Sequence, residues 1–226
     1  MKRRNFIKLS AMGTATVAVS GFENSLLGQK QSTILNFPIS SAKIISTWNH
    51  GLAANDKAWE VLNKNGSALD AVEQGVRTTE SDASNRSVGL GGLPDATGKV
   101  TLDACIMDHK FNCGSVSFLQ NIENPISVAR KIMEETPHVM LSGKGAYNFA
   151  IEKGFKHKEL LIPETKLAWE KWMSTNDKKK PQINSENHDT IGLLAIDNKG
   201  NISGACTTSG WAYKIHGRVG DSPIIG

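Results

Sequence analysis

The best candidate for a reactive site in this sequence is the point where a polar stretch meets an apolar one. Residues 174–187 (STNDKKKPQINSEN) contain one hydrophobic side chain, Ile183, and predict an exposed loop. Residues 190–196 (TIGLLAI) follow and are typical of a buried strand that begins at Thr190. An internal cleavage site needs this arrangement, with deformable backbone before it and anchored backbone after it. A threonine at the start of a strand is also common without any chemistry, because β-branched residues favour strands.

A second pair of candidate residues lies near the end of the sequence. Arg218 and Asp221 are three residues apart in the stretch GRVGD. A guanidinium can bind the carboxylate of a free amino acid through two hydrogen bonds, and a carboxylate can bind its ammonium group. The pair therefore suits an amino-acid ligand, and the alternative is a local surface salt bridge.

Other kinds of site are disfavoured by residue spacing. The glycine-rich stretch 87–94 (SVGLGGLP) has neither G-x-G-x-x-G nor Walker spacing, so it predicts turns rather than a phosphate site. No cluster of histidines or carboxylates has metal-ligand spacing, and we expect neither metal nor cofactor. Cys105, Cys113 and Cys206 form no C-x-x-C pair. Their odd number favours buried free thiols over a disulfide framework, and a Cys105–Cys113 bridge stays open.

The excess positive charge of the chain lies at its N-terminus. The formal net charge is +4, and the first 20 residues hold Lys2, Arg3, Arg4 and Lys8 but no acidic residue. The rest of the chain is neutral overall, which argues against a nucleic-acid partner. The apolar stretch 9–19 is too short to span a membrane. Paired arginines before Phe-Ile-Lys resemble a bacterial twin-arginine export signal and predict a periplasmic or secreted protein; a Sec signal or a disordered basic tail are the alternatives.

Hydrophobic periodicity predicts a chain that mixes strands and helices. The length of 226 residues suits one domain with a substantial core. Expected strands cover residues 42–47, 100–107, 114–119, 190–196 and 202–208, and the last two form a hairpin around the turn DNKGN. Expected helices cover residues 53–63, 68–80, 125–133, 143–153 and 164–173.

Several blocks of the sequence, taken in order, resemble the glycosylasparaginase family. Residues 187–192 (NHDTIG) resemble the cleavage motif of that family, and residues 102–108 (LDACIMD) resemble its LDA-x-x-MD segment. Similar blocks are STWNHG at 46–51, NPISVA at 124–129, TPHVML at 136–141, GACTTSG at 204–210 and YKIHGRVGDSPIIG at 213–226. The resemblance spans roughly residues 40–226 and implies an α+β fold, the four-layer αββα sandwich of N-terminal-nucleophile hydrolases.

The resemblance also implies a self-cleaving amidohydrolase. The hydroxyl of Thr190 would attack the carbonyl of Asp189, and water would hydrolyse the resulting ester. The new α-amine of Thr190 would have a pKa of roughly 7.7–8.0, near the pH at which a general base works best. Thr190 would then hydrolyse the amide between N-acetylglucosamine and the side chain of asparagine, as nucleophile and base together. Asp189 would act in cleavage as a base or as a strained residue, and His188 as a base or as an ordinary loop residue.

Family resemblance assigns further roles to four residues. Thr208 matches a residue whose hydroxyl supports the nucleophile, and its neighbour Thr207 is the alternative match, one position earlier. Arg218 and Asp221 match residues that hold the amino-acid end of the substrate. Trp48 matches an aromatic residue near the substrate, and a buried core tryptophan is the alternative.

The family pattern divides the chain and leaves two other functions open. It predicts a signal peptide at 1–20, a polar segment at 21–41, an α-subunit part at 42–189 and the start of a β-subunit part at 190–226. Family chains continue for on the order of a hundred residues and include a Thr-Gly pair that resembles an oxyanion hole, so we expect the sandwich to be incomplete at Gly226. The expected partners are a small glycosyl-asparagine substrate, no nucleic acid and no membrane, with an α/β heterodimer or its dimer in a complete protein. A plant-type asparaginase or isoaspartyl peptidase is the alternative enzyme, although those usually show G-T-V-G; an inactive homologue is the non-enzyme alternative.

Overall fold

One mixed sheet organises the part of the chain that can be described. The structure, a computed structural model, describes residues 42–175 and 190–225. The strand order is β1-β5-β6-β2-β3-β4, and every neighbouring pair is antiparallel except β3 and β4. The strands are β1 (Lys43–Ser46), β2 (Leu102–Met107), β3 (Cys113–Leu119), β4 (Met140–Ser142), β5 (Thr190–Ile196) and β6 (Ile202–Thr208).

The central hairpin of β5 and β6 sets the register of the sheet. Its turn is fixed by Asp197, whose Oδ1 accepts hydrogen bonds from the backbone N–H groups of Lys199 (2.9 Å) and Asn201 (3.0 Å). Gly200 takes a φ of +81°, which a side chain would disfavour. With the turn fixed, Ile196 faces Ile202 at one end of the hairpin and Thr190 faces Thr208 at the other.

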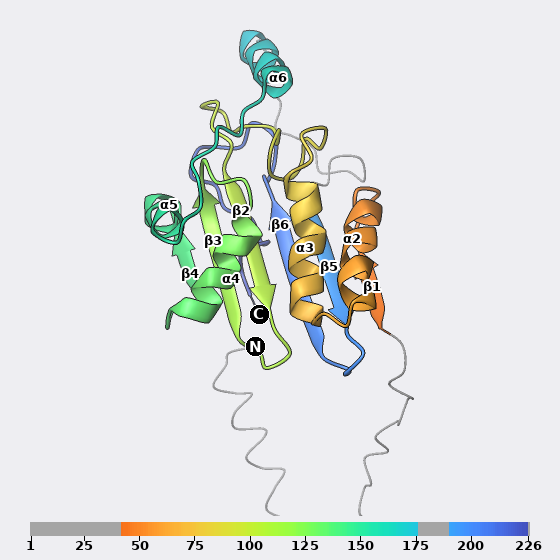
Figure 1. The fold of residues 1–226 in the computed structure, drawn as a ribbon. Coiled ribbons are helices and arrows are strands. Elements are labelled where there is room, and N and C mark those ends of the chain that lie inside the picture. Colours follow the sequence, from red (N-terminus) through yellow and green to blue (C-terminus); the bar gives the residue numbers. More distant parts are fainter. Residues whose placement is uncertain (1–41, 176–189, 226) are drawn as a thin grey trace, which may run out of the picture. The chain divides into compact units, whose positions relative to one another are not determined.

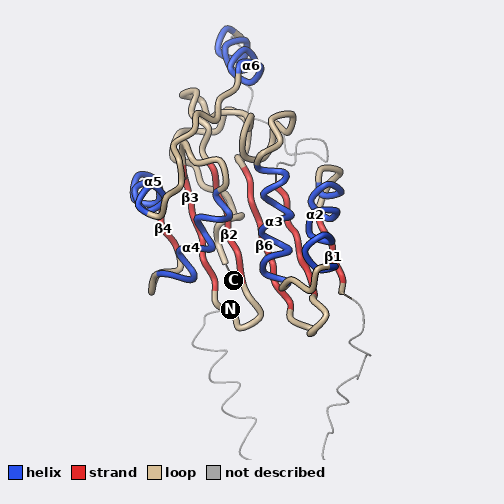
Figure 2. The backbone as a smooth tube through the Cα atoms, viewed as in Figure 1, coloured by secondary structure: helices blue, strands red, loops and turns tan. Residues whose placement is uncertain are grey.

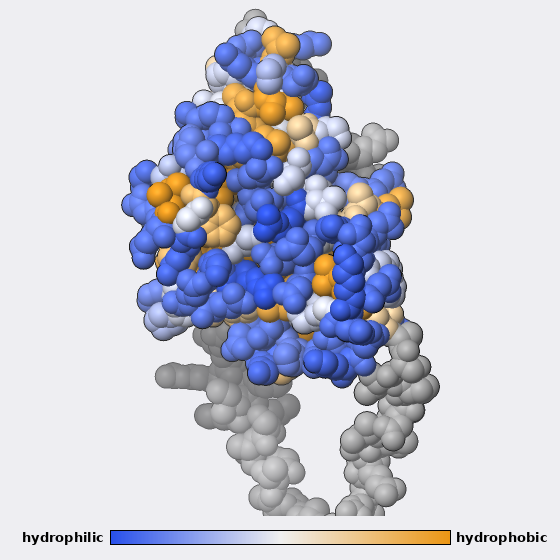
Figure 3. All heavy atoms as spheres, viewed as in Figure 1, coloured by the Kyte–Doolittle hydropathy of each residue, from blue (hydrophilic) through white to orange (hydrophobic). Residues whose placement is uncertain are grey.

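Three helices cover one face of this sheet (Figures 1 and 2). They are α2 (Gly51–Asn63), α3 (Ala68–Glu80) and α4 (Pro125–Glu135). Alternate residues of β5, Ile191 and Leu193 among them, are buried against this layer because successive side chains of a strand point to opposite faces. Gly75 lets α3 lie close to α2, since a Cβ there would come within 2.8 Å of the Ala54 carbonyl oxygen. The outer surface of the helical layer is mostly hydrophilic, as Figure 3 shows.

Two further helices pack away from the centre. Helix α5 (Gly143–Glu152) lies beside β3 and β4, and α6 (Pro163–Ser174) projects beyond one end of the sheet. Trp172 of α6 stacks on Tyr213, with ring centroids 4.6 Å apart. Trp169 of the same helix donates from Nε1 to the carbonyl oxygen of Ala96 at 3.4 Å. Helix α6 therefore braces the loop that follows β6.

The other face of the sheet carries exposed apolar side chains. Ile45, Leu194 and Ile202 are 66%, 54% and 55% exposed. None of the helices described in residues 42–175 lies on this face, which we call the open face. The described chain thus supplies one helical layer and one sheet, which is half of the predicted four-layer sandwich.

The α+β class and the hairpin predicted from the sequence are confirmed, with some differences. The helix expected at 125–133 extends to Glu135, and the strand expected at 100–107 begins only at Leu102. Strand β4 was not predicted. All three cysteines are free; Cys113 faces Met107, whereas Cys105 faces Cys206. The exposed loop expected at 174–187 starts later than predicted, because Ser174 is the last residue of α6. The rest of that loop from residue 176 on, the leader, the polar segment at 21–41, His188 and Asp189 fall outside the described residues.

Candidate active site

Three polar residues form a row across the sheet. Thr190 of β5 lies opposite Thr208 of β6, which in turn lies opposite Asp103 of β2. Thr208 is 2% exposed and Asp103 is fully buried. Because directly paired residues of neighbouring strands share a face, these three lie together on the open face. Thr190 is therefore the first residue of a row of polar groups at one end of an otherwise apolar surface.

The backbone around Thr190 is clamped by Thr47, which follows β1. The Thr47 hydroxyl donates to the carbonyl oxygen of Thr190 at 3.1 Å and accepts from the backbone N–H of Gly192 at 2.9 Å. The backbone N–H of Thr47 donates to the Gly192 carbonyl at 3.0 Å. Three hydrogen bonds thus hold residues 190–192, the start of β5, directly after the predicted cleavage point.

The hydroxyl of Thr190 has a serine side chain as a hydrogen-bond partner. Oγ1 of Thr190 lies 3.3 Å from Oγ of Ser222, and either can donate. Ser222 is 6% exposed. Nothing in the sequence marked Ser222 as a site residue, although it directly follows Asp221 in a block that resembles the family.

The register of the hairpin separates Thr208 from its neighbour Thr207. Thr208 shares the face of Thr190, and its hydroxyl accepts from the backbone N–H of Gly210 at 2.9 Å. Thr207 points the other way, and its hydroxyl donates to the buried carboxyl of Glu80 at 2.7 Å. Only Thr208 is thus placed on the same side as the candidate nucleophile.

Asp103 holds the loop that carries Arg218 and Asp221. One carboxylate oxygen of Asp103 accepts from the backbone N–H of Phe118 at 2.8 Å, and the other from Gly220 at 3.5 Å. The guanidinium of Arg218 lies over the ring of Trp211, 4.5 Å from its centroid. Among the described residues, no ion pair joins Arg218 to Asp221, so the local salt bridge considered from the sequence is not formed. Arg218 is partly buried and Asp221 is exposed.

A second anchor of the same loop is the pair His216 and Asp95. Nδ1 of His216 lies 2.6 Å from Oδ2 of Asp95, and Oδ1 of Asp95 accepts from the backbone and side chain of Thr97 and the backbone of Lys99. Burial alone would raise the pKa of Asp95, but these hydrogen bonds hold it below the usual value. Lys214 donates from Nζ to the carbonyl oxygens of Thr101 and Ser209. These contacts hold the loop before Arg218, and the contact between Gly220 and Asp103 holds it after Arg218.

Trp48 stands next to the Thr47 clamp in a strained conformation. Its φ is +61°, a region that L-residues rarely adopt, and its side chain is 44% exposed. The exposed fraction argues against a buried core tryptophan. The structure places Trp48 at the edge of the same end of the sheet.

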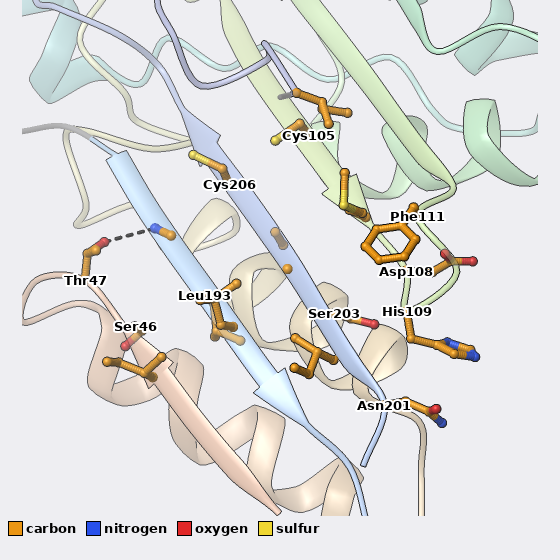
Figure 4. Close-up of a pocket in the computed structure, with 18 of the residues that line it drawn as sticks. Ser46, Thr47, Cys105, Asp108, His109, Phe111, Leu193, Asn201, Ser203 and Cys206 are labelled. Atoms are coloured by element: carbon orange, nitrogen blue, oxygen red, sulfur yellow. Dashed lines mark hydrogen bonds between the residues drawn. The ribbon is translucent and has the colours of Figure 1, made fainter. Parts of the chain in front are cut away.

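An apolar cleft continues from the polar row along the open face (Figure 4). Its volume is about 850 Å3, and it extends from Thr47 and Gly192 past Cys105 and Cys206 to Phe111. Neither Thr190 nor Arg218 lines it.

In residues 42–175 and 190–225, His, Cys, Asp and Glu side chains make no cluster of three suited to a metal ion. Each helix in those same ranges is too short or too polar to cross a bilayer.

Comparison with known proteins gives this geometry a family. The family model described as "Asparaginase" matches residues 38–226. The chain belongs to this asparaginase family. It is 56% identical, over 99% of its length, to the N(4)-(beta-N-acetylglucosaminyl)-L-asparaginase of Elizabethkingia miricola. It is 35% identical to the enzymes of the same name from Rattus norvegicus and Mus musculus, over 81% of its length.

Membership of the asparaginase family confirms the resemblance and the fold class inferred from the sequence. The family is one of N-terminal-nucleophile hydrolases, whose fold mixes a sheet with helical layers, as seen here. The chain spans 65% of the length of the Elizabethkingia protein, 61% of the rat protein and 62% of the mouse protein.

Proposed function

We propose that this protein is an amidohydrolase that releases N-acetylglucosamine from the side chain of asparagine, with Thr190 as its nucleophile. One observation supports this most directly. Thr190 begins a central strand, and its hydroxyl lies 3.3 Å from Ser222 on the same face as Thr208. The name of the 56% identical relative supports the substrate class.

Thr190 gains its base by cleavage of the Asp189–Thr190 bond. Its hydroxyl attacks the Asp189 carbonyl and displaces the Thr190 nitrogen, which forms an ester, and water then hydrolyses that ester. The products are a carboxylate on Asp189 and a free α-amine on Thr190. The Thr47 clamp holds the carbonyl of Thr190 and the backbone of Gly192 during this step, so that the nucleophile keeps its place after the backbone is broken.

Turnover then uses the amine and the hydroxyl of one residue. The amine takes the hydroxyl proton while the oxygen attacks the side-chain amide carbon of the substrate. The sugar amine leaves with that proton, and water hydrolyses the aspartyl ester to release aspartate. Ser222, which contacts the Thr190 hydroxyl, and Thr208, which pairs with Thr190 on the same face, would orient that hydroxyl in both steps.

The loop after β6 suits the amino-acid end of the substrate. Arg218 would bind the α-carboxylate through two hydrogen bonds, and Asp221 would bind the α-ammonium. Trp211 stacks on the guanidinium of Arg218 and limits its freedom. Trp48, half exposed beside the Thr47 clamp, offers a flat apolar surface to the substrate.

The experiment that tests this proposal compares substrates on purified protein. We expect the wild type to release the sugar from glycosyl-asparagine as the amine of N-acetylglucosamine, and Thr190→Ala to release none. Thr78→Ala is the matched control, since the Thr78 hydroxyl donates within α3 to Gln74 on the helical side. Hydrolysis of a β-aspartyl dipeptide in preference to glycosyl-asparagine would support the plant-type enzyme instead. Equal turnover by Thr190→Ala and the wild type would reject Thr190 as the nucleophile.

We also propose that the protein is exported in bacteria through its twin-arginine leader and works in the periplasm or outside the cell. The paired residues Arg3 and Arg4 support this proposal. Replacing both with lysine should keep the protein in the cytoplasm, as cell fractionation would show, and unchanged export would contradict it.

After cleavage the two fragments should stay together as an α/β heterodimer, because β5 and β6 pair on both sides with strands from before the cleavage point.

A further inference from the structure

A histidine in the turn that ends at Arg218 is bound to a buried carboxylate. The turn is closed by a hydrogen bond from the backbone N–H of Arg218 to the carbonyl oxygen of Ile215 at 2.9 Å. His216 and Gly217 are its central residues, and Gly217 takes a φ of +91°, which glycine adopts without strain. Nδ1 of His216 lies 2.6 Å from Oδ2 of Asp95. Through His216, the turn that carries Arg218 is attached to a fixed point of the fold.

Asp95 is itself held rigidly, and this defines the direction of the hydrogen bond. Its side chain is fully buried, and its Oδ1 accepts from the backbone (2.9 Å) and hydroxyl (2.7 Å) of Thr97 and from the backbone of Lys99 (3.1 Å). Although burial opposes them, these bonds hold the pKa of Asp95 below its usual value, so the group is a carboxylate. A carboxylate only accepts, so the hydrogen of this contact lies on Nδ1 of His216.

The other side of the His216 ring connects to the second anchor of the loop. The ring meets that of Phe118 edge to face, with centroids 4.9 Å apart and an angle of 81° between the planes. The backbone N–H of Phe118 donates to Asp103 at 2.8 Å, and the other oxygen of Asp103 accepts from the backbone of Gly220 at 3.5 Å. The residues just before and just after Arg218 are thus fixed through one connected set of contacts.

The guanidinium of Arg218 fits closely into the place where this loop puts it. Its Cζ lies 4.5 Å from the centroid of the Trp211 ring. A Cβ at Gly210 would come within 3.2 Å of its Nη1, and a Cβ at Gly220 within 3.0 Å. The guanidinium is therefore in contact on three sides, and a small displacement of the turn would move it out of this place. Bidentate binding of a carboxylate depends on the orientation of the guanidinium plane.

We propose that His216 is a positioning residue for substrate binding, whose hydrogen bond to Asp95 fixes the turn that holds Arg218 in place for the α-carboxylate of the substrate. The inference rests on the proposed function, because it takes Arg218 as the carboxylate-binding residue. His216 acts through Arg218 and takes no part in the chemical steps at Thr190. Its loss should therefore weaken binding of the substrate and leave the chemical step unchanged.

Two substitutions separate the hydrogen bond of His216 from its bulk. His216→Asn places an amide N–H near the position of Nδ1 and can still donate to Asp95, whereas His216→Leu cannot donate. We expect His216→Leu to raise KM for glycosyl-asparagine about tenfold, with kcat within about twofold of the wild type. In His216→Asn, KM should stay within about threefold of the wild type. His157→Leu is the matched control and should change neither constant, because this histidine contacts the carboxylate of Glu159 beside α5.

A second measurement does not depend on activity. The five tryptophans are replaced by fluorotryptophan during expression, and the fluorine NMR signal of Trp211 is identified by its loss in Trp211→Phe. Because the guanidinium lies over this ring, Arg218→Ala should shift the signal. His216→Leu should shift it in the same direction, and His216→Asn should leave it at the wild-type position.

The inference is overturned if His216→Leu and His216→Asn change KM alike, or if His216→Leu lowers kcat and leaves KM unchanged. A Trp211 signal that stays in place in His216→Leu would overturn it as well. A wild type that does not hydrolyse glycosyl-asparagine would refute the proposed function instead, and the Trp211 signal would still show whether His216 holds Arg218.

Nitrogen NMR of the wild type keeps the inference testable where His216→Leu folds poorly. A neutral His216 with its hydrogen on Nδ1 supports the bond to Asp95, and one with its hydrogen on Nε2 overturns it.

Discussion

Glu80 allows a quantitative test of how the core supports the site. It is the last residue of α3 and is fully buried on the helical side of the sheet. Its Oε1 accepts hydrogen bonds from the Thr207 hydroxyl at 2.7 Å and the Ile126 backbone N–H at 3.1 Å. Asn124 donates to Oε2 at 3.3 Å. This carboxyl therefore holds the end of β6, next to Thr208, against the start of α4.

The buried carboxyl of Glu80 makes stability depend on pH. Burial raises the pKa of Glu80 from the usual 4.5 to about 8, and its hydrogen bonds offset only part of the rise. The folded protein thus keeps a proton that the unfolded chain loses above pH 4.5. The contribution of Glu80 to the free energy of unfolding is fully present below pH 4.5. It is lost as the pH rises toward 8, by about 1.4 kcal/mol per unit and about 5 kcal/mol in all.

Urea unfolding of the wild type and Glu80→Gln between about pH 5 and pH 8 measures this dependence. The glutamine cannot ionise, so its free energy of unfolding, relative to the wild type, should rise by about 4 kcal/mol over those three units. Glu60→Gln, on the exposed side of α2, is the control and should leave the wild-type dependence on pH unchanged. A constant difference between Glu80→Gln and the wild type would refute the reasoning, since it would mean that Glu80 ionises alike in both states.

The remaining predictions concern the polar row and the loop. Ser222→Ala should lower kcat about tenfold with little change in KM, measured by steady-state kinetics, because it removes one hydrogen bond to the nucleophile. Arg218→Lys should raise KM about ten- to a hundredfold, because lysine cannot make the bidentate contact; an unchanged KM would exclude carboxylate binding there. Asp103→Asn should lower the free energy of unfolding by about 1–3 kcal/mol, because an amide N–H would face a backbone donor; chemical denaturation measures this.

Local patterns predicted most of the elements but not what they bring together. Residues 68–80 and 190–196 were predicted to their ends, because one follows Ser67, whose side chain caps the helix, and the other is a continuous apolar run. Strand β4 was missed because it has three residues, mostly exposed, and pairs only along β3. A strand this short shows no alternation.

The candidate site depends on pairing between distant residues, which a single sequence does not contain. Thr47 and Thr190 are 143 positions apart and meet only because β1 pairs with β5. Thr208 could not be distinguished from Thr207 until the register of the hairpin was known. Ser222 had no signal beyond its place beside Asp221. The opposition of Cys105 and Cys206 likewise follows from the register of β2 and β6.

The most direct test of the account is to identify the N-terminal residues of the purified protein by chemical labelling of α-amines and mass spectrometry. We predict a fragment whose free α-amine belongs to Thr190, with its partner ending at Asp189, and neither fragment in Thr190→Ala. A protein that hydrolyses glycosyl-asparagine while the bond between Asp189 and Thr190 stays intact would contradict the account.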